Sequence, residues 1–278
     1  MIPSMYTGYI CEEIKQGRFK TFEEGLRHYK SLGLKTAQIS DELKNSDLTP
    51  ETVAELFGKV GIEPVCHTVI CSIAAAEKDR YEEGLALLRT EIKNAAVMGC
   101  SMIMVVPNPE DIHDLSEKPA AAQRIIDTLN LVCDEAEALG VTVTIENFSS
   151  KKAPFQTPEE CLHILKNVPK LKFVIDTGNF YFPKSDLIAA WELLKDYTIH
   201  VHVKDWMLVD EKTGIPTPDG EFLCSVSPDD PRGVTETDAF LKRIAADGFK
   251  GSLVAEYNGF KEIEGELDQM LEYYKQFQ

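Results

Sequence analysis

Hydrophobic and polar residues alternate along residues 198–205, which read Thr-Ile-His-Val-His-Val-Lys-Asp. A period of two is typical of a β-strand, and it separates this stretch into two faces. The apolar face holds Ile199, Val201 and Val203, and the polar face holds Thr198, His200, His202 and Lys204. Strands covered by helices are usually apolar on both faces, so an inward polar face needs hydrogen bonds, ion pairs or a metal. We therefore expect this polar face to line an active site.

Similar short strand patterns recur along the chain, each after a helical pattern. Several of the helical patterns end at a glycine, namely at Gly33, Gly61, Gly99 and Gly140. The strands are expected at residues 34–40, 62–67, 100–106, 141–146, 171–176, 198–205 and 252–256, with a less regular first strand within 2–10. Strands that alternate with helices run parallel, and this count favours a closed (β/α)₈ barrel over an open doubly wound sheet. We interpret residues 1–278 as a single domain of this kind.

The intervening helices carry their own start and stop signals. Ile125 and Leu129 recur at helical spacing between Pro119 and Gly140. Proline near the start of a helix and glycine after its end are the usual arrangement. The run Thr157-Pro158-Glu159-Glu160 predicts another helix start, with threonine as the N-cap and a capping box.

Residues 206–236 are the exception to the alternation. This segment contains Pro216, Pro218, Ser227-Pro228 and Asp230-Pro231, and it is too rich in turn formers to be one regular element. A loop of this length in a compact domain is usually functional or mobile. Because it follows the seventh strand, we expect it to lie over the C-terminal mouth of the barrel, where barrel active sites lie.

The amino-acid composition limits the classes of molecule that we expect the protein to bind. Lys and Arg number 29 and Asp and Glu number 46, which gives a formal net charge of −17. An acidic surface repels phosphate backbones and anionic lipids, and no dense Lys/Arg cluster interrupts it, so we expect no nucleic-acid partner. No apolar run approaches the roughly 20 residues of a membrane span, so we expect no membrane partner. A small-molecule substrate suits this surface better, and association into a homo-oligomer is left open.

Cysteine usage and the N-terminus bear on the compartment. The seven cysteines are scattered, and no pair has C-x-x-C spacing. This predicts neither a disulfide framework nor a structural zinc site. The N-terminus shows no basic segment followed by an apolar run and a cleavage site. We therefore expect a cytoplasmic protein with most of its cysteines in the core.

Four strands in the second half of the chain end with an acid or a histidine on the inward face. Val143 and Ile145 share the apolar face of one strand, which leaves Glu146 on the other. The same parity turns Asp176 and Glu256 inward beside His202. Three carboxylates cannot converge in a low dielectric without compensation, and a divalent cation would supply it. The alternative is that each acid pairs locally with Lys or Arg.

Three oxygen ligands and one imidazole suit a borderline-hard ion. We take Mn²⁺ as the first choice, with Mg²⁺, Co²⁺ or Zn²⁺ as alternatives. His200 shares the inward face with His202 but lies about 6.6 Å deeper at the rise of a strand. We therefore assign His200 to support of the site and His202 to the metal.

At these residues the sequence resembles the xylose isomerase-like TIM barrel superfamily, and within it the sugar phosphate isomerase/epimerase group. The matching segments are Ile145-Glu146-Asn147, Asp176-Thr177-Gly178-Asn179, His202-Val203-Lys204-Asp205 and Ala255-Glu256. They lie in the C-terminal half and are spaced by whole βα units. The N-terminal half matches mainly in its alternation of strands and helices. The group also contains ketose 3-epimerases, inosose dehydratases and apurinic endonucleases.

The resemblance implies one divalent metal held by Glu146, Asp176, His202 and Glu256. It also implies that Glu146 and Glu256 are the acid/base pair, one removing a proton next to a carbonyl and the other returning it from the opposite face. A metal that binds the carbonyl and a neighbouring hydroxyl would stabilise the enediolate formed between these steps. If one glutamate moved the proton along one face instead, the product would be an aldose–ketose isomer. The sequence leaves these outcomes, the sugar and its phosphorylation open.

Other functions of the group remain as alternatives. A lyase of the inosose dehydratase type would use the same metal and a carboxylate base, and a non-catalytic barrel could bind a sugar or a metal with the same cage. Many relatives carry a histidine where this chain has Asn179. An amide is a poor zinc ligand, and the chain has only six histidines, which disfavours an endonuclease with three zinc ions.

Five residues are predicted to bind the substrate. His67 would lie near the mouth of the third strand, and a structural histidine is the alternative. Lys204 ends the seventh strand, where it could contact the substrate or pair with a neighbouring acid. Arg232, in the long segment, could bind a hydroxyl or a phosphate group, or be solvated. The full set is His67, Asn108, Asn179, Lys204 and Arg232.

Overall fold

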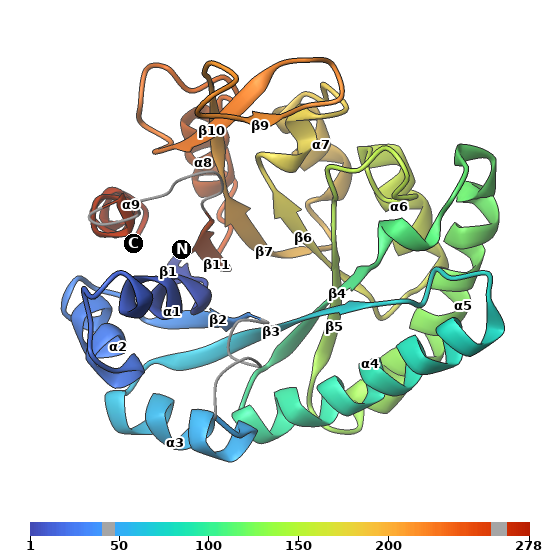
Figure 1. Ribbon diagram of the computed structural model, residues 1–278, viewed down its shortest axis with the longest axis horizontal. Helices are drawn as coiled ribbons and strands as arrows, with labels where there is room; N and C mark the ends of the chain where they lie inside the picture. The colour runs from blue at the N-terminus through green and yellow to red at the C-terminus, as the bar shows by residue number, and fades with distance from the viewer. Residues whose placement is uncertain (41–47, 257–265) are drawn as a thin grey trace.

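The short strand patterns of the sequence form one sheet of eight strands, and helices surround it (Figure 1). The strands are β1 (Ile2–Met5), β2 (Thr36–Ile39), β3 (Glu63–Cys71), β4 (Met102–Pro107), β5 (Thr142–Glu146), β6 (Lys172–Asp176), β7 (Thr198–Val203) and β11 (Ser252–Ala255). Paired neighbours in this sheet run parallel. The computed structural model describes residues 1–40, 48–256 and 266–278. The predicted (β/α)₈ barrel is confirmed.

The barrel nearly closes between its first two strands. Its hydrogen-bonded order is β1-β11-β7-β6-β5-β4-β3-β2, so β1 and β2 are the two ends of the sheet. Just beyond β1, a parallel bridge joins Tyr6 to Gln38, and the backbone N–H of Thr7 donates to Gln38 O at 2.9 Å. This near-closure brings the side chains of β2 across the interior from those of β7.

The helices follow the strands as the repeating pattern predicts. They are α1 (Gly8–Lys15), α2 (Phe22–Ser31), α3 (Pro50–Val60), α4 (Lys78–Met98), α5 (Lys118–Glu137), α6 (Pro158–Asn167), α7 (Leu187–Leu194), α8 (Thr237–Ala246) and α9 (Glu266–Tyr274), with short 3₁₀ turns at Pro109–Asp111, Leu115–Glu117, Asn179–Tyr181 and Lys275–Phe277. Gly61 and Gly99 end α3 and α4 with φ of 75° and 82°, a left-handed conformation that favours glycine. At α6, Thr157 and Glu160 form the predicted capping box.

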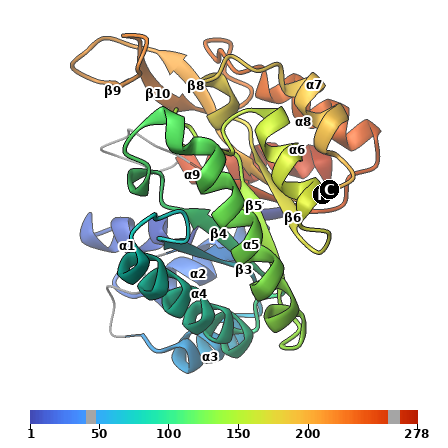
Figure 2. The ribbon, with the colours of Figure 1, turned by 90° about the vertical axis from the view of Figure 1, so that its right-hand side faces the viewer.

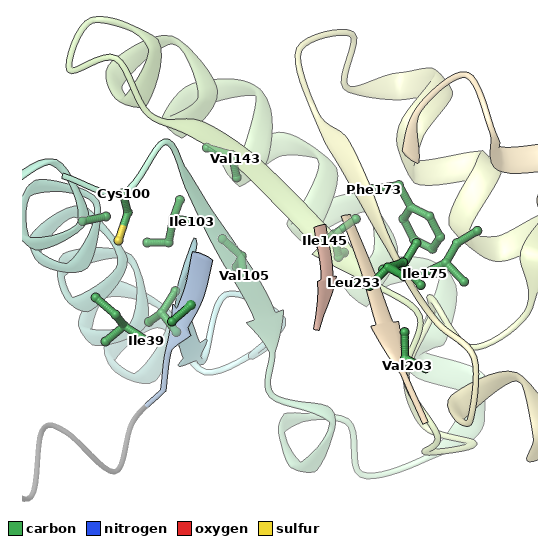
Figure 3. Close-up of a cluster of buried hydrophobic side chains, with 14 of the residues drawn as sticks. Ile39, Cys100, Ile103, Val105, Val143, Ile145, Phe173, Ile175, Val203 and Leu253 are labelled. Carbon is green, nitrogen blue, oxygen red and sulfur yellow. The ribbon is translucent and has the colours of Figure 1, made fainter. Parts of the chain in front are cut away.

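The strands separate a large outer core from a smaller inner one. Side chains on the outward faces, such as Ile103 of β4 and Ile145 of β5, pack in one cluster together with residues of the helices (Figure 3). This is the parity that the sequence predicts for β5. The inner cluster consists of Val65, Cys66, Met102, Met104, Val106 and Val174. Towards the carboxyl ends of the strands the interior becomes polar, with Gln38, His200 and His202 fully buried.

Residues 206–236 contain a small antiparallel sheet that the turn-rich sequence does not reveal. Its strands are β8 (Asp205–Leu208), β9 (Ile215–Pro216) and β10 (Phe222–Val226), in the order β8-β10-β9. The strand predicted over 198–205 therefore ends at Val203, and a new strand begins at Asp205. Figure 2 shows this sheet at one end of the molecule.

Contacts with loops after two barrel strands hold the small sheet in place. Lys151, in the loop after β5, lies 3.3 Å from Asp219 at the turn between β9 and β10. After β6, the Tyr181 hydroxyl donates to Glu221 at 3.0 Å, and Lys184 donates to the same carboxylate at 2.8 Å. The sheet is thus fastened to the loops at the carboxyl ends of β5 and β6.

Two boundaries differ from the sequence prediction. The third strand was expected to end at His67 and continues to Cys71. The last barrel strand, expected over residues 252–256, ends at Ala255. In the described part of the chain, every helix is too short or too polar to cross a lipid bilayer.

Candidate metal centre

Four strand ends bring their polar side chains together inside the barrel. Glu146 ends β5, Asp176 ends β6, His202 lies on β7, and Glu256 directly follows β11. The register explains the convergence, because Asp176 pairs with His202 and His202 pairs with Val254, two residues before Glu256. One ligand atom from each of these four residues lies within 4.8 Å of the others. The convergence predicted from parity is present in the structure.

His202 lies between two carboxylates and an amide. Its Nδ1 is 2.7 Å from Glu146 Oε1 and 3.1 Å from Glu256 Oε2. Its Nε2 is 2.9 Å from Oε1 of Gln38 on β2. The Nδ1 atom therefore faces the acids, while Nε2 points away from them.

Lys204 enters the same cluster from the end of β7. Its Nζ lies 2.7 Å from Asp176 Oδ2 and 2.6 Å from Glu256 Oε1, and its side chain is 3% exposed. Gly178 leaves room for this lysine, since a Cβ there would meet Lys204 Cγ at 2.7 Å. Of the two roles considered for Lys204, the structure shows the ion pair with neighbouring acids.

Burial and opposite charges act against each other on the basic groups. Burial alone would lower the pKa of His202, but Glu146 and Glu256 raise it to about 10. Burial likewise would lower the pKa of Lys204, but the carboxylates of Asp176 and Glu256 raise it above its usual range. At neutral pH and without a metal, both groups are therefore cations.

The two cations compensate only part of the negative charge that the three acids of the cluster can carry. Burial would raise the pKa of Glu256, but Lys204 and His202 hold it well below its usual range. Burial raises the pKa of Asp176 well above its usual range, and Lys204 offsets this only in part. Glu256 and Glu146 raise the pKa of Asp176 further, so a cation bound beside Asp176 would favour its ionised form. Three carboxyl groups and one imidazole are also a donor set that a divalent cation binds well, so these residues fit such an ion.

Two asparagines orient Asp176. The side chain of Asn147 accepts a hydrogen bond from Asp176 N at 2.8 Å and donates to Asp176 O at 2.9 Å. Asn179 N donates to Asp176 Oδ1 at 2.8 Å, and its side chain donates to Asn147 O at 2.9 Å. Lys204 Nζ reaches Asn179 Oδ1 at 3.5 Å. Asn179, predicted to bind the substrate, thus lies beside the cluster and supports one of its acids.

His200 lies one layer deeper on β7, as the strand rise predicts. Its Nε2 is 2.8 Å from Gln38 Oε1, and burial holds its pKa well below the usual value. Sequence reasoning missed Gln38 and Tyr6, whose hydroxyl lies 3.3 Å from His202 Nδ1. The signal for Gln38 was available, because a polar residue between Ala37 and Ile39 breaks an apolar strand in the same way as the histidines of β7.

Three other predicted substrate residues have partners that do not belong to the cluster. His67 is buried with its Nε2 2.6 Å from Glu91 Oε2 on α4, so its predicted place at the mouth is corrected to the helix-facing side of β3. Asn108 follows β4 and accepts a hydrogen bond from Glu110 N at 3.1 Å. Arg232 pairs with Asp230 at 2.5 Å, and its side chain is 66% exposed.

Asp205, the last residue of the alternating stretch, accepts three backbone hydrogen bonds outside the cluster. Its Oδ1 accepts hydrogen bonds from Trp206 N at 2.7 Å and Thr235 N at 3.1 Å, and its Oδ2 accepts one from Thr237 N at 3.2 Å. Val234 N also donates to Trp206 O at 2.7 Å. One buried carboxylate therefore joins both ends of the segment 206–236 to the start of α8.

The fold and the cluster together define a (β/α)₈ barrel with a candidate metal site at the carboxyl ends of its strands. A sequence profile of the xylose isomerase-like TIM barrel family matches residues 26–277. The chain therefore belongs to this family, as the motifs predicted. A search of curated protein sequences finds no significant match.

Solved structures share the fold over nearly the whole chain. A 3-keto-D-glucoside 4-epimerase from E. coli has a TM-score of 0.69 and 16% identity, over 91% of this chain and 94% of that chain. A probable 3-DHS dehydratase from Bacillus anthracis has a TM-score of 0.74 and 14% identity, over 99% of both chains. D-psicose 3-epimerase has a TM-score of 0.68 and 16% identity, over 99% of this chain and 90% of that chain. The chain also spans 41% of a fusion of a xylose isomerase-like TIM barrel with a 4-hydroxyphenylpyruvate dioxygenase, with a TM-score of 0.73 and 17% identity.

Proposed function

We propose that this protein is a divalent-metal-dependent isomerase or epimerase of a small sugar or sugar-like polyhydroxy carbonyl compound. The observation that carries the proposal is the cluster of Glu146, Asp176, His202 and Glu256, whose ligand atoms lie within 4.8 Å of one another. The carboxyl ends of the strands are where barrel enzymes hold their active sites. Membership of the xylose isomerase-like family supports this proposal.

The four residues of the cluster would hold one ion, with Mn²⁺ as the first choice and Mg²⁺, Co²⁺ or Zn²⁺ as alternatives. When bound, the ion supplies Lewis-acid stabilisation for negative charge on substrate oxygens. The imidazole of His202 would bind through Nδ1, the atom that faces the carboxylates, and this requires the loss of a proton from Nδ1. Two hydrogen bonds hold the backbone of Asp176 to the side chain of Asn147, so Asp176 is oriented before a metal binds.

Glu146 and Glu256 are proposed as the acid/base pair. Both carboxylates lie against the same nitrogen of His202, at 2.7 and 3.1 Å, so a substrate bound at the cluster meets both. For epimerisation, one carboxylate accepts the proton from the carbon next to the carbonyl. The electron pair of the broken C–H bond moves into the carbonyl group, which gives an enediolate. The other carboxylate returns a proton to the opposite face of the same carbon. Return to the neighbouring carbon along one face gives an aldose–ketose isomer instead.

Substrate contacts are proposed for Lys204, Asn179 and Asn108. The first two lie in the cluster or beside it, and Asn108 follows β4 at the same end of the barrel. His67 and Arg232 are not included, because one pairs with Glu91 on α4 and the other with Asp230.

The remaining proposals concern the number of domains, the segment over the mouth of the barrel, the cellular location and the binding partner. We treat residues 1–278 as one domain, with the segment 206–236 covering part of the mouth. The contacts of Asp219 and Glu221 with loops after β5 and β6 support this placement. A cytoplasmic location is supported by the seven cysteines, which are scattered along the sequence without C-x-x-C spacing. The proposed partner is a small carbohydrate rather than a nucleic acid or a membrane.

Deuterium exchange tests the proposed chemistry. Candidate ketoses and inososes are incubated in D₂O with the Mn²⁺-loaded protein, and the recovered sugars are examined by mass spectrometry and chromatography. An epimerase or isomerase yields label on the carbon next to the carbonyl, together with a new stereoisomer or an aldose. Bound metal without label in any compound would contradict the proposal and favour a binding role.

A second candidate, a lyase that removes water, is favoured by the position of Lys204. Its ammonium lies 2.6 Å from Glu256 Oε1, so an acid and a base lie side by side. After a carboxylate removes the proton next to the carbonyl, the leaving hydroxyl accepts a proton from Lys204, and a C=C bond and water form. The same experiment separates the candidates, because a lyase product has lost the mass of one water molecule.

A further inference from the structure

Gln38 makes hydrogen bonds to both histidines of β7 from the opposite side of the barrel. Its Oε1 lies 2.8 Å from His200 Nε2 and 2.9 Å from His202 Nε2. All three side chains are fully buried. One carbonyl oxygen on β2 therefore connects the deeper histidine to the histidine of the cluster.

The surroundings of Gln38 determine which end of its amide faces the histidines. The NH₂ group donates to Thr68 Oγ1 at 2.8 Å and to the Tyr6 hydroxyl at 3.2 Å. It also lies 3.8 Å from Met104 Sδ, which accepts hydrogen bonds but donates none. With the NH₂ group held on this side, the oxygen faces the imidazoles. A carbonyl oxygen only accepts, so Nε2 of each histidine must carry a proton.

The reverse orientation would leave a buried N–H group without an acceptor. If the NH₂ group faced the imidazoles, a neutral His200 would carry its proton on Nδ1. That atom is buried and has no hydrogen-bond partner in the described chain. Nδ1 of His200 lacks a partner in either orientation, and a buried N–H without an acceptor is rarer in proteins than a buried acceptor without a donor. With the oxygen facing the imidazoles, the one N–H of neutral His200 donates to Gln38 Oε1.

We propose that Gln38 is a positioning residue that keeps the proton of both histidines on Nε2 and thereby presents Nδ1 of His202 to the acidic cluster. This inference rests on the proposed function in one respect, namely that the cluster binds a divalent ion. With Nε2 protonated, loss of the second proton of His202 leaves a lone pair on Nδ1, the atom that lies 2.7 Å from Glu146 Oε1 and 3.1 Å from Glu256 Oε2. Partners that fix the tautomer of a metal-binding histidine typically change metal affinity 10–100-fold when they are removed.

Nitrogen NMR on the metal-free protein tests the tautomer directly. In protein labelled with ¹⁵N-histidine, His200 of the wild type is expected as the Nε2–H tautomer. Gln38→Leu removes the acceptor and should shift His200 towards Nδ1–H or a mixture. Gln38→Glu retains an oxygen at this position and should restore Nε2–H. An unchanged Nε2–H signal of His200 in Gln38→Leu overturns the proposal.

Calorimetric titration with Mn²⁺ provides the second measurement. Gln38→Leu is expected to bind Mn²⁺ roughly 10–100-fold more weakly than the wild type. Gln156→Leu is the matched control, because it removes another buried glutamine, whose amide donates to Ser149 O outside the cluster. Equal affinity of Gln38→Leu and wild type would contradict the role of Gln38.

A milder variant keeps the test usable if Gln38→Leu does not fold. Thr68→Val removes the hydroxyl that holds the amide but preserves shape, and it should weaken Mn²⁺ binding severalfold and broaden the His200 tautomer distribution. Wild-type behaviour in both measurements overturns the proposal. If the wild type binds no divalent ion while the tautomer still depends on Gln38, the metal-dependent function fails and the positioning role stands.

Discussion

The Nζ atom of Lys204 lies 2.6 Å from Oε1 of Glu256, in a buried ion pair inside the acidic cluster. The same ammonium lies 2.7 Å from Asp176 Oδ2. A divalent ion held by the cluster would bind these two carboxylates as well. Lys204 therefore provides part of the positive charge in the metal-free protein, and a metal would compete with it for the same two carboxyl groups.

Lys204→Met should destabilise the metal-free protein by about 3–5 kcal/mol, because two buried carboxylates lose their cation. Mn²⁺ should recover much of this loss and bind more tightly than to the wild type. Urea unfolding with and without Mn²⁺ measures both effects. Lys184→Met is the control, since Lys184 forms an exposed ion pair with Glu221 and should change stability by less than about 1 kcal/mol. A metal-free Lys204→Met protein as stable as the wild type would refute this account.

Glu146→Gln and Glu256→Gln should each reduce turnover by at least about 10²–10⁴-fold, since each removes one partner of the proton transfer. Deuterium incorporation into the substrate is the measurement, with bound metal determined on the same samples. Glu135→Gln, on an exposed glutamate paired with Arg89, should retain wild-type exchange. Full exchange in both cluster variants would mean that another group removes the proton.

His202→Ala should lose bound metal, whereas His200→Ala should retain it. The reason is depth, because His202 pairs in register with Asp176 while His200 pairs with Val174 one layer below. Metal analysis after gel filtration in dilute Mn²⁺ distinguishes the two variants. Metal retained in His202→Ala and lost from His200→Ala would reverse the assignment of the two layers.

The metal-free protein should lose stability in mildly alkaline solution. The pKa of His202 is raised from 6.5 to about 10 in the folded state, so its contribution is fully present below about pH 6.5 and is lost as pH rises through 10. One titrating proton gives a slope of at most about 1.4 kcal/mol per pH unit in this window. Urea unfolding from pH 6 to 10 should show a steeper decline in the wild type than in His202→Gln. Parallel curves would mean that His202 is not charged in the folded state.

Asp205→Ala should loosen the segment 206–236 without unfolding the barrel. The change leaves three backbone N–H groups, those of Trp206, Thr235 and Thr237, without their acceptor, at a cost of about 1–3 kcal/mol for each group that stays buried. Hydrogen exchange and limited proteolysis should increase within the segment. Asp210→Ala, at an exposed turn of the same segment, is the control and should have a small effect. Equal protection in both variants would show that Asp205 is not what closes the segment.

The local pattern of the sequence was sufficient to predict the strands of the second half of the chain and the residues on their inward faces. Glu146, Asp176, His202 and Glu256 follow from the period of two, because adjacent residues of a strand must point to opposite faces. The same rule placed His200 below His202. Capping signals at Thr157 were equally reliable, since an N-cap bond spans only three residues.

The same rule failed on the third strand, where both faces are largely apolar. Val65 and Val69 lie on either side of His67, and Cys66 and Thr68 alternate with them, so composition does not show which face is inward. Packing against α4 decides it, and His67 meets Glu91 there. The antiparallel strands within 206–236 were hidden for a similar reason, because their pairing is set by partners distant in sequence, such as Leu208 with Leu223.

The sequence by itself determined which residues of the last four barrel strands point inward, because side-chain direction along a strand is a local property and these strands have one apolar face. Only the tertiary structure decided what those residues meet, because Gln38 and His202 are 164 positions apart and become neighbours when the barrel nearly closes. The same is true of Lys204, whose place at the end of β7 was evident while its two acidic partners were not. Closure of the sheet turns separate polar strand ends into one charged site.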